Sequence, residues 1–207
     1  MIRPTGFRGA AFGRASHGDG RRDGDTRKQI SRLLGIPTEW AYLRQVHSGD
    51  VVRAVAPGVL GEADALFTTE RGLPMVVATA DCFPIVMEGP GSAAVVHAGW
   101  RGVAAGVAAN TRRALEEAGS PAQRAAIGPG IGPCCFEVGP EVAARFPGRT
   151  ATTTGGSLSV DLRAALADQL NGLDVWRAAE CTFCGDGYES YRREGTDRRQ
   201  VALAWLP

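Results

Sequence analysis

Residues 78–102 read ATADCFPIVMEGPGSAAVVHAGWRG, and this stretch decides the expected fold. Two short apolar runs, residues 75–79 and residues 93–96, have the length and the Val, Met and Ala content of buried strands. A side chain that can bind a metal follows each run, Cys82 shortly after the first and His97 directly after the second. A glycine turn and an amphipathic pattern come next. We therefore expect a functional site where strands meet the start of a helix in an α/β fold.

The composition sets limits on the class of protein. A chain of 207 residues can bury one sizeable core, and we expect residues 1–207 to form a single domain, with a flexible or divergent polar segment at residues 1–25. The 23 basic and 22 acidic side chains give a net charge of +1. We therefore expect no excess of positive charge that would bind nucleic acid or a membrane surface. No apolar run reaches the roughly 18–20 residues of a membrane span. Five cysteines cannot fill a disulfide framework, which favours a reduced, cytoplasmic setting.

Elsewhere the pattern interleaves strands and helices. Helices are expected at residues 26–34, 103–118, 140–146 and 162–170, and further strands at residues 40–46, 51–55, 62–69, 173–179 and 200–206. The short turn after residues 40–46 predicts a hairpin with His47 at its tip or edge. Residues 99–102 lead directly into the second of these helices, and they form either an anion-binding turn or a plain tight turn.

Three side chains form the preferred metal-binding group. The chain has only three histidines, and two of them, His47 and His97, end apolar runs. Cys82 is the one further soft ligand in these runs. A lone Cys or His is more often a structural side chain, so the hypothesis depends on the coincidence of all three. Two imidazoles and one thiolate leave a fourth position for water or substrate, as in a catalytic zinc site.

Charged side chains near this group are candidates for the chemistry. Asp81 lies beside the thiolate and could orient a ligand or shuttle a proton, and Glu137 is a second candidate for proton transfer. Arg101 could hold an anionic group. Asp64 alternates with apolar neighbours, which predicts a carboxylate that points inward.

Two other zinc arrangements compete with this group. Cys181 and Cys184 have the spacing of half a structural zinc site, and Cys134 with Cys135 could complete a four-thiolate cage. Against the cage, adjacent cysteines are a poor chelating pair and the two halves lie far apart in sequence. A zinc deaminase needs His-x-Glu before Pro-Cys-x-x-Cys, and the chain contains no His-x-Glu.

Six blocks of sequence, in order, resemble the YfiH-like laccase-domain family, whose members are described as polyphenol oxidases and as purine nucleoside phosphorylases. The blocks are QVH (45–47), EADA (62–65), TADC (79–82), HAGWRG (97–102), IGP with IGPC (127–134), and CTFC with SYRR (181–193). The similarity runs from about residue 43 to the C-terminus. Residues 15–25 depart from it, because they lack the Ser-Leu-Asn-Leu-Gly-like segment usual in the family.

The resemblance implies a fold, a metal and an activity. The fold is a mixed α/β sandwich of the YfiH-like type, in which helices flank mixed β-sheets. The cofactor is zinc on His47, Cys82 and His97, and the activity is phosphate-dependent cleavage of adenosine, inosine and methylthioadenosine with a side activity that deaminates adenosine. We take Cys82, Asp81 and Arg101 as catalytic candidates. The candidates for binding substrate or phosphate are Arg44, Arg101, Gly102, Cys134 and Arg192.

The resemblance leaves two other functions open. One is a copper-dependent, laccase-like polyphenol oxidase. Three histidines are too few for a multicopper centre, but a single copper could take the same three ligands as zinc. The other is a factor that edits cell-wall precursors, which no residue distinguishes from a nucleoside enzyme. The oligomeric state is not indicated by the sequence.

Overall fold

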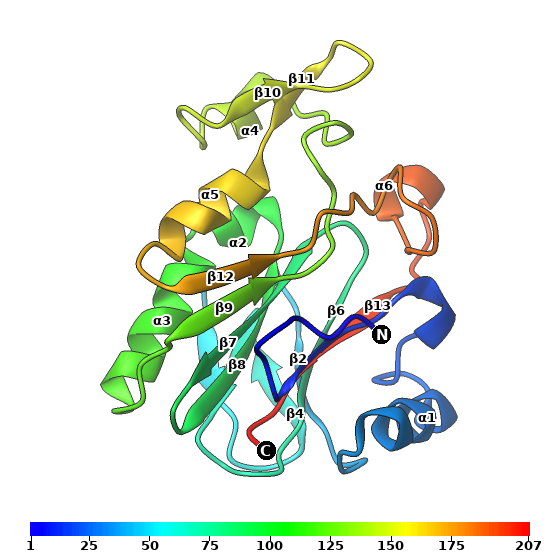
Figure 1. The fold of residues 1–207 in the computed structure, drawn as a ribbon. Helices are drawn as coiled ribbons and strands as arrows, with labels where there is room; N and C mark the ends of the chain where they lie inside the picture. Colours follow the sequence, from blue (N-terminus) through cyan, green and yellow to red (C-terminus); the bar gives the residue numbers. More distant parts are fainter.

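Two β-sheets packed face to face form the centre of the computed structural model, which describes residues 1–207 (Figure 1). The five-stranded sheet has the order β1 (Ala10–Phe12), β13 (Gln200–Ala204), β6 (Met75–Thr79), β2 (Ala41–Arg44) and β4 (Gly58–Glu62). The six-stranded sheet has the order β12 (Asp174–Arg177), β9 (Arg124–Ile127), β7 (Phe83–Gly89), β8 (Ser92–Ala98), β5 (Ala65–Thr68) and β3 (Val51–Arg53). Both sheets contain parallel and antiparallel pairs, so the sheets are mixed.

Alternating side chains explain why both faces of each sheet are covered. In β7, Val86 faces the layer between the two sheets, whereas Ile85 and Met87 face the opposite layer. In β6, Val77 faces the inter-sheet layer and Val76 the opposite one. Successive residues of a strand point to opposite faces, so a strand that is apolar throughout must be buried on both. The fold therefore has an inter-sheet core and two outer cores.

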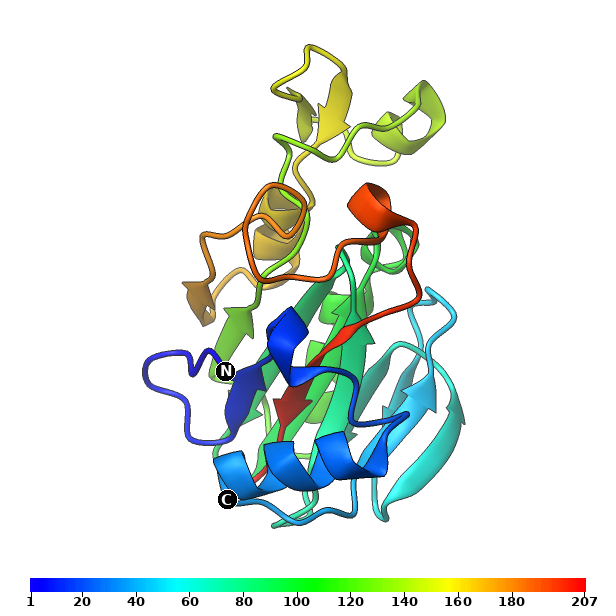
Figure 2. The same ribbon diagram turned by 90° about the vertical axis from the view of Figure 1, so that its right-hand side faces the viewer.

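Helices cover the outer faces of the sandwich. The six-stranded sheet packs against α2 (Trp100–Ala104), α3 (Val107–Glu117) and α5 (Leu162–Gln169), whereas α1 (Gly24–Leu34) lies across the five-stranded sheet (Figures 1 and 2). The side chain of Asp161 caps α5 by accepting the N–H of Ala164. The predicted fold class, a mixed α/β sandwich flanked by helices, is confirmed.

A smaller extension projects from one end of the sandwich. It contains α4 (Pro140–Ala143) and the antiparallel pair β10 (Thr150–Thr152) and β11 (Leu158–Val160), which lie at the top of Figure 1. A further short helix, α6 (Tyr191–Glu194), lies at the upper right of Figure 1, below the extension. No helix of the structure combines the length and the apolar character that crossing a membrane requires.

Two expectations about local structure are wrong, and one strand lies outside the predicted elements. Residues 40–46 and 51–55 do not form a hairpin, because β2 and β3 belong to different sheets. The helix expected at residues 103–118 is two helices, α2 and α3, separated by Gly106 in the left-handed conformation with φ of 76°. Strand β7 has no counterpart among the predicted strands, because its Pro84 and the following glycines obscure the strand pattern.

The N-terminal segment also differs from the sequence prediction. Residues 1–25 contain strand β1, which pairs with β13 inside the five-stranded sheet. Helix α1 begins at Gly24, earlier than the expected residue 26, because Asp23 provides the cap. The carboxylate of Asp23 accepts the backbone N–H of Asp25 and of Thr26, which satisfies two donors of the first turn.

Candidate metal centre and the pocket around it

The structure brings together the three side chains that the sequence indicated as metal ligands. His47 lies on the connection between β2 and β3, Cys82 on the tight turn between β6 and β7, and His97 near the end of β8. One ligand atom from each lies within 4.8 Å of the others, and His47 Nε2 is 3.9 Å from Cys82 Sγ. His47 has a left-handed backbone with φ of 63°. Because β2 and β3 lie in different sheets, His47 reaches the site from the crossover between them.

The backbone of Gly99 lies so close to His47 and Cys82 that no side chain fits at residue 99. A Cβ built at this position would lie 2.6 Å from His47 Cδ2 and 3.0 Å from Cys82 Sγ. The glycine therefore lets the backbone pass directly against the imidazole and the thiol. Two nitrogen donors and one thiolate, held at one point with room left on one side, fit a zinc ion that keeps an open coordination position.

Asp64 fixes the orientation of His97. Its side chain is fully buried, and Oδ1 lies 2.7 Å from His97 Nδ1. Its other oxygen accepts the backbone N–H groups of Val46 and Ser48, on both sides of His47. The carboxylate thereby leaves Nε2 of His97 available for a metal, in the arrangement usual for zinc-bound histidines. The prediction that Asp64 points inward is confirmed.

Cys82 and His97 shift each other's pKa in opposite directions. Burial raises the pKa of the Cys82 thiol, but the charge of His97 and the hydrogen bonds from both imidazoles outweigh it and lower this pKa to about 6. Burial lowers the pKa of His97, yet the Cys82 thiolate and the Asp64 carboxylate raise it to about 9. A thiolate is the form in which cysteine binds a metal. The site therefore presents Cys82 in the form that zinc requires.

Asp81 stands beside this group, but its carboxylate is already occupied. Oδ1 accepts the hydroxyl of Thr182 at 2.8 Å, and Oδ2 accepts the backbone N–H of Arg192 at 2.7 Å. The residue has a left-handed backbone with φ of 82°, which Asp tolerates better than most residues. Asp81 therefore joins the turn that carries Cys82 to two segments from the C-terminal part of the chain.

The metal-binding group opens into a pocket of about 550 Å³. This volume lies within the roughly 300–1,000 Å³ typical of small-molecule sites. The pocket is lined by Arg21, Arg22, Leu43, Arg44, Gln45, His47, Ala78, Ala80, Cys82, His97, Arg101, Tyr191 and Arg199. Arg44 pairs with Glu62 at 2.9 Å, whereas Arg101 forms no ion pair and lies over the ring of Trp100. Arg101 is thus a cation available to an anionic ligand.

Some candidate residues lie outside the pocket. Gly102 is buried beneath the carbonyl of Ser48, and Cys134 lies in a separate group of cysteines. The guanidinium of Arg192 donates to the carbonyl of Glu137 at 2.8 Å and lies over an aromatic ring. The structure therefore does not bring these residues into the group that lines the pocket.

The sequence interpretation missed several residues that line the pocket. Arg21 belongs to the polar segment that the sequence predicts to be flexible or divergent, yet its guanidinium binds Asp19 and donates to the side chain of Gln45. The Gln45 amide in turn pairs with both the N–H and the carbonyl of Ala78. Arg199 comes from the segment before β13 and lies over the ring of Tyr191. No spacing pattern in the sequence connects these residues. Only the QVH and SYRR blocks, which contain Gln45 and Tyr191, indicated this part of the pocket lining.

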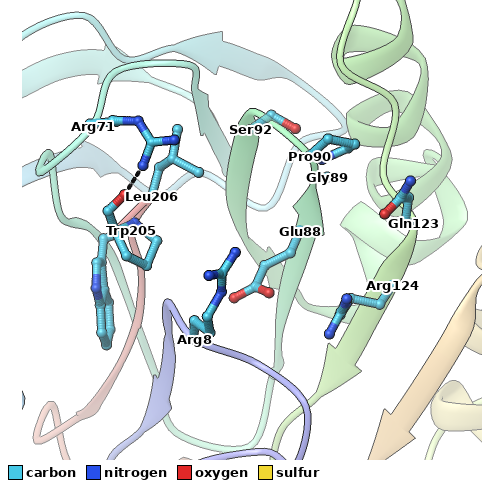
Figure 3. Close-up of a pocket in the computed structure, with 11 residues that line it drawn as sticks. Arg8, Arg71, Glu88, Gly89, Pro90, Ser92, Gln123, Arg124, Trp205 and Leu206 are labelled. Atoms are coloured by element: carbon cyan, nitrogen blue, oxygen red, sulfur yellow. Dashed lines mark hydrogen bonds between the residues drawn. The ribbon is translucent and has the colours of Figure 1, made fainter.

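A second hollow of about 220 Å³ lies at a different place, beside the C-terminus (Figure 3). Figure 3 shows the carboxylate of Glu88 between the side chains of Arg8 and Arg124. That carboxylate accepts the backbone N–H of Gly9 at 2.9 Å. Neither group of clustered metal-binding side chains lines this hollow. The larger pocket is therefore the candidate active site.

Comparison with known proteins identifies the family. The chain belongs to the family described as multi-copper polyphenol oxidoreductase laccase, whose sequence profile matches residues 5–207. This is the YfiH-like laccase-domain family that the sequence blocks resemble, so that prediction is confirmed.

Relatives and solved structures agree with this assignment. A protein of Corynebacterium glutamicum named purine nucleoside phosphorylase is 38% identical over 198 residues, which cover 87% of this chain and 80% of the relative. A purine nucleoside phosphorylase of Deinococcus radiodurans is 35% identical over 202 residues, with coverage of 91% and 79%. The crystal structure of YlmD from Geobacillus stearothermophilus superimposes with a TM-score of 0.81 at 27% identity, and the match covers 91% of this chain and 82% of YlmD.

Proposed function

We propose that the chain is a zinc-dependent purine nucleoside phosphorylase that cleaves adenosine, inosine and methylthioadenosine. The observation that carries the proposal is that the group of His47, Cys82 and His97 opens into the same pocket as the unpaired cation of Arg101. The names of the relatives from Corynebacterium and Deinococcus support the same activity.

In the proposed reaction, an oxygen of phosphate forms a bond to C1′ of the ribose and the bond between C1′ and the purine nitrogen breaks. The purine leaves with the bonding electron pair and takes up a proton. Arg101 holds the phosphate by charge-assisted hydrogen bonds, and Arg44, which also lines the pocket, adds positive charge. Tyr191, at the rim of the pocket, offers an aromatic ring to the purine.

His47, Cys82 and His97 would hold the zinc ion. When bound, zinc would act as a Lewis acid towards an oxygen or nitrogen of the bound ligand. Asp64 holds His97 in the orientation that this requires. We propose that Asp81 keeps the turn with Cys82 in place through Thr182, because both its oxygens already accept hydrogen bonds.

We propose zinc rather than a copper centre because the chain has too few histidines near the pocket. The third histidine of the chain, His17, lies against the N-terminal amine at 2.9 Å and is not part of the pocket. One Cys and two His suit a single ion, whereas a multicopper centre needs many more imidazoles. Deamination of adenosine remains the proposed side activity, since a water molecule could reach a purine in this open pocket.

The test uses purified, zinc-loaded protein with adenosine, in the presence and absence of phosphate. We expect release of adenine that requires phosphate, a smaller yield of inosine, and loss of both products in Cys82→Ala. An Arg113→Ala variant on the exposed face of α3 is the matched control and should keep the activity. Zinc-loaded protein that releases no base, or a Cys82→Ala variant that is fully active, would contradict the proposal.

A further inference from the structure

Four thiols that the pocket does not use lie together at one point. They are Cys134, Cys135, Cys181 and Cys184, and their sulfur atoms all lie within 4.8 Å of one another. We refer to them as the four-cysteine cluster. Two of them come from the loop after β9 and two from the segment after β12.

Strand pairing brings the two halves of the cluster together. Strands β9 and β12 are parallel neighbours, and beyond their ends Gly130 pairs with Cys181. The N–H of Thr182 donates to the carbonyl of Gly130 at 3.1 Å. The large separation in sequence, which argued against a four-thiolate cage, is therefore removed by the fold. The turn at Gly132 places the adjacent thiols of Cys134 and Cys135 on the same side, which removes the second objection.

The distance between two of the sulfur atoms matches that expected around one tetrahedral ion. A zinc–sulfur distance of about 2.3 Å places the sulfurs of a tetrahedral site about 3.8 Å apart. The Sγ atoms of Cys134 and Cys184 are 3.9 Å apart. A disulfide would need about 2.05 Å. Four sulfurs in tetrahedral array are typical of zinc or of an iron site.

Hydrogen-bond donors surround the C-terminal half of the cluster. The backbone N–H of Gly132 donates to Sγ of Cys181 at 3.1 Å. The guanidinium of Arg193 donates to the carbonyls of Thr182 and Phe183, inside the turn that joins the two C-terminal cysteines. N–H donors and a neighbouring cation offset the negative charge of a zinc ion with four thiolates, as outer partners do in metal sites.

We propose that the four-cysteine cluster binds a second, structural zinc ion. The ion fastens the extension with β10 and β11 to the sandwich, since Thr154 N–H and hydroxyl both donate to the carbonyl of Cys134. It also holds Thr182, whose hydroxyl donates to Asp81 beside the metal ligand Cys82. The second zinc thereby supports the turn that carries a ligand of the first.

Metal analysis of protein purified with zinc and without chelator tests the proposal. We expect about two zinc ions per chain in the wild type and about one in Cys184→Ser or Cys134→Ser. His47→Ala, which lacks a ligand of the pocket site, should keep about one zinc ion. Cobalt-loaded His47→Ala should show intense sulfur-to-cobalt charge-transfer absorption, as four thiolates require, and His47→Ala/Cys184→Ser should lose it. A red, iron-containing His47→Ala protein would show that iron rather than zinc is bound and would overturn the choice of metal.

A measurement on the wild type avoids variants that fail to fold. Alkylation followed by mass spectrometry of each cysteine peptide should show all four cysteines protected in the zinc-loaded protein. They should become reactive together when a chelator is added. A wild type that binds only one zinc ion and loses it in His47→Ala would overturn the proposal. A disulfide between Cys134 and Cys184 in metal-free protein that takes up no zinc after reduction would overturn it too.

Discussion

Asp64 and His97 are joined by two hydrogen bonds. Asp64 Oδ1 lies 2.7 Å from His97 Nδ1, and the backbone N–H of His97 donates to the carbonyl of Asp64, also at 2.7 Å. Burial opposes ionisation of Asp64, but the hydrogen bonds from His97 and Ser48 hold its pKa below the ordinary value. The carboxylate is therefore charged at neutral pH, and it orients the imidazole before any metal arrives.

Replacing this carboxylate by an amide should weaken metal binding. We expect Asp64→Asn to lower zinc affinity at the pocket site by about 10–100-fold, because His97 loses the charged partner that orients it. Competition with a chromogenic chelator measures the affinity, in a Cys184→Ser background that removes the four-cysteine cluster. Asp168→Asn, which breaks an exposed pair with Arg149, is the matched control and should leave the affinity unchanged. Equal affinities in the two variants would show that Asp64 does not support the site.

The variant Gly99→Ala should disrupt the same metal site through a steric clash, without changing any charge. In Gly99→Ala the new Cβ would lie within 3.0 Å of both His47 and Cys82, so one ligand must move. We expect zinc affinity to fall at least about tenfold, the smallest loss seen when support of a ligand is removed. Gly91→Ala is the control, since its Cβ would meet no atom closer than 3.6 Å. Two variants that bind zinc alike would argue against the close approach of the backbone to the ligands.

The pH dependence of Cys82 follows from its lowered pKa. In metal-free protein this pKa is about 6, so the thiolate fraction rises as the pH passes about 6 and is nearly complete at neutral pH. Alkylation of the Cys82 peptide by iodoacetamide, followed by mass spectrometry, should show its half-maximal rate near that pH. In His97→Ala, which removes the stabilising imidazolium, the midpoint should move upward. A wild-type midpoint close to the ordinary value of about 8.5 would contradict the thiolate–imidazolium pair.

The phosphate-binding role of Arg101 predicts a selective change in kinetics. Loss of hydrogen bonds to a charged ligand costs about 1.5–3 kcal/mol, which corresponds to roughly a 10–150-fold change in binding. Arg101→Ala should therefore raise the KM for phosphate by this factor and change the KM for inosine much less. Arg113→Ala should change neither constant. A rise confined to the nucleoside KM would place the phosphate elsewhere in the pocket.

The sequence predicted the metal-binding group better than the path of the chain around it. His47, Cys82 and His97 could be selected because soft ligands at the ends of apolar runs are rare in this chain. The sheet change between β2 and β3 could not be predicted, because Ala41 pairs with Met75, far away in sequence. Local patterns report which face of a strand is apolar, but they do not report its neighbours.

The other features that the sequence did not predict also depend on backbone conformation or on contacts between distant parts of the chain. Gly106 ends α2 through a left-handed backbone, although the apolar pattern continues across it into α3. Arg21 and Arg199 reach the pocket from segments with no periodic pattern, and only tertiary contacts place them there. The four-cysteine cluster depends on the parallel pairing of β9 with β12, so its two halves appear unrelated in the sequence.

Phosphorus NMR of zinc-loaded protein with inosine and phosphate tests the central claim most directly. The predicted result is a growing ribose 1-phosphate signal in the wild type that matches the hypoxanthine released, and none in Cys82→Ala with the same fold. Free ribose in place of ribose 1-phosphate, or a signal of equal size in the Cys82→Ala variant, would contradict phosphorolysis at the site of His47, Cys82 and His97.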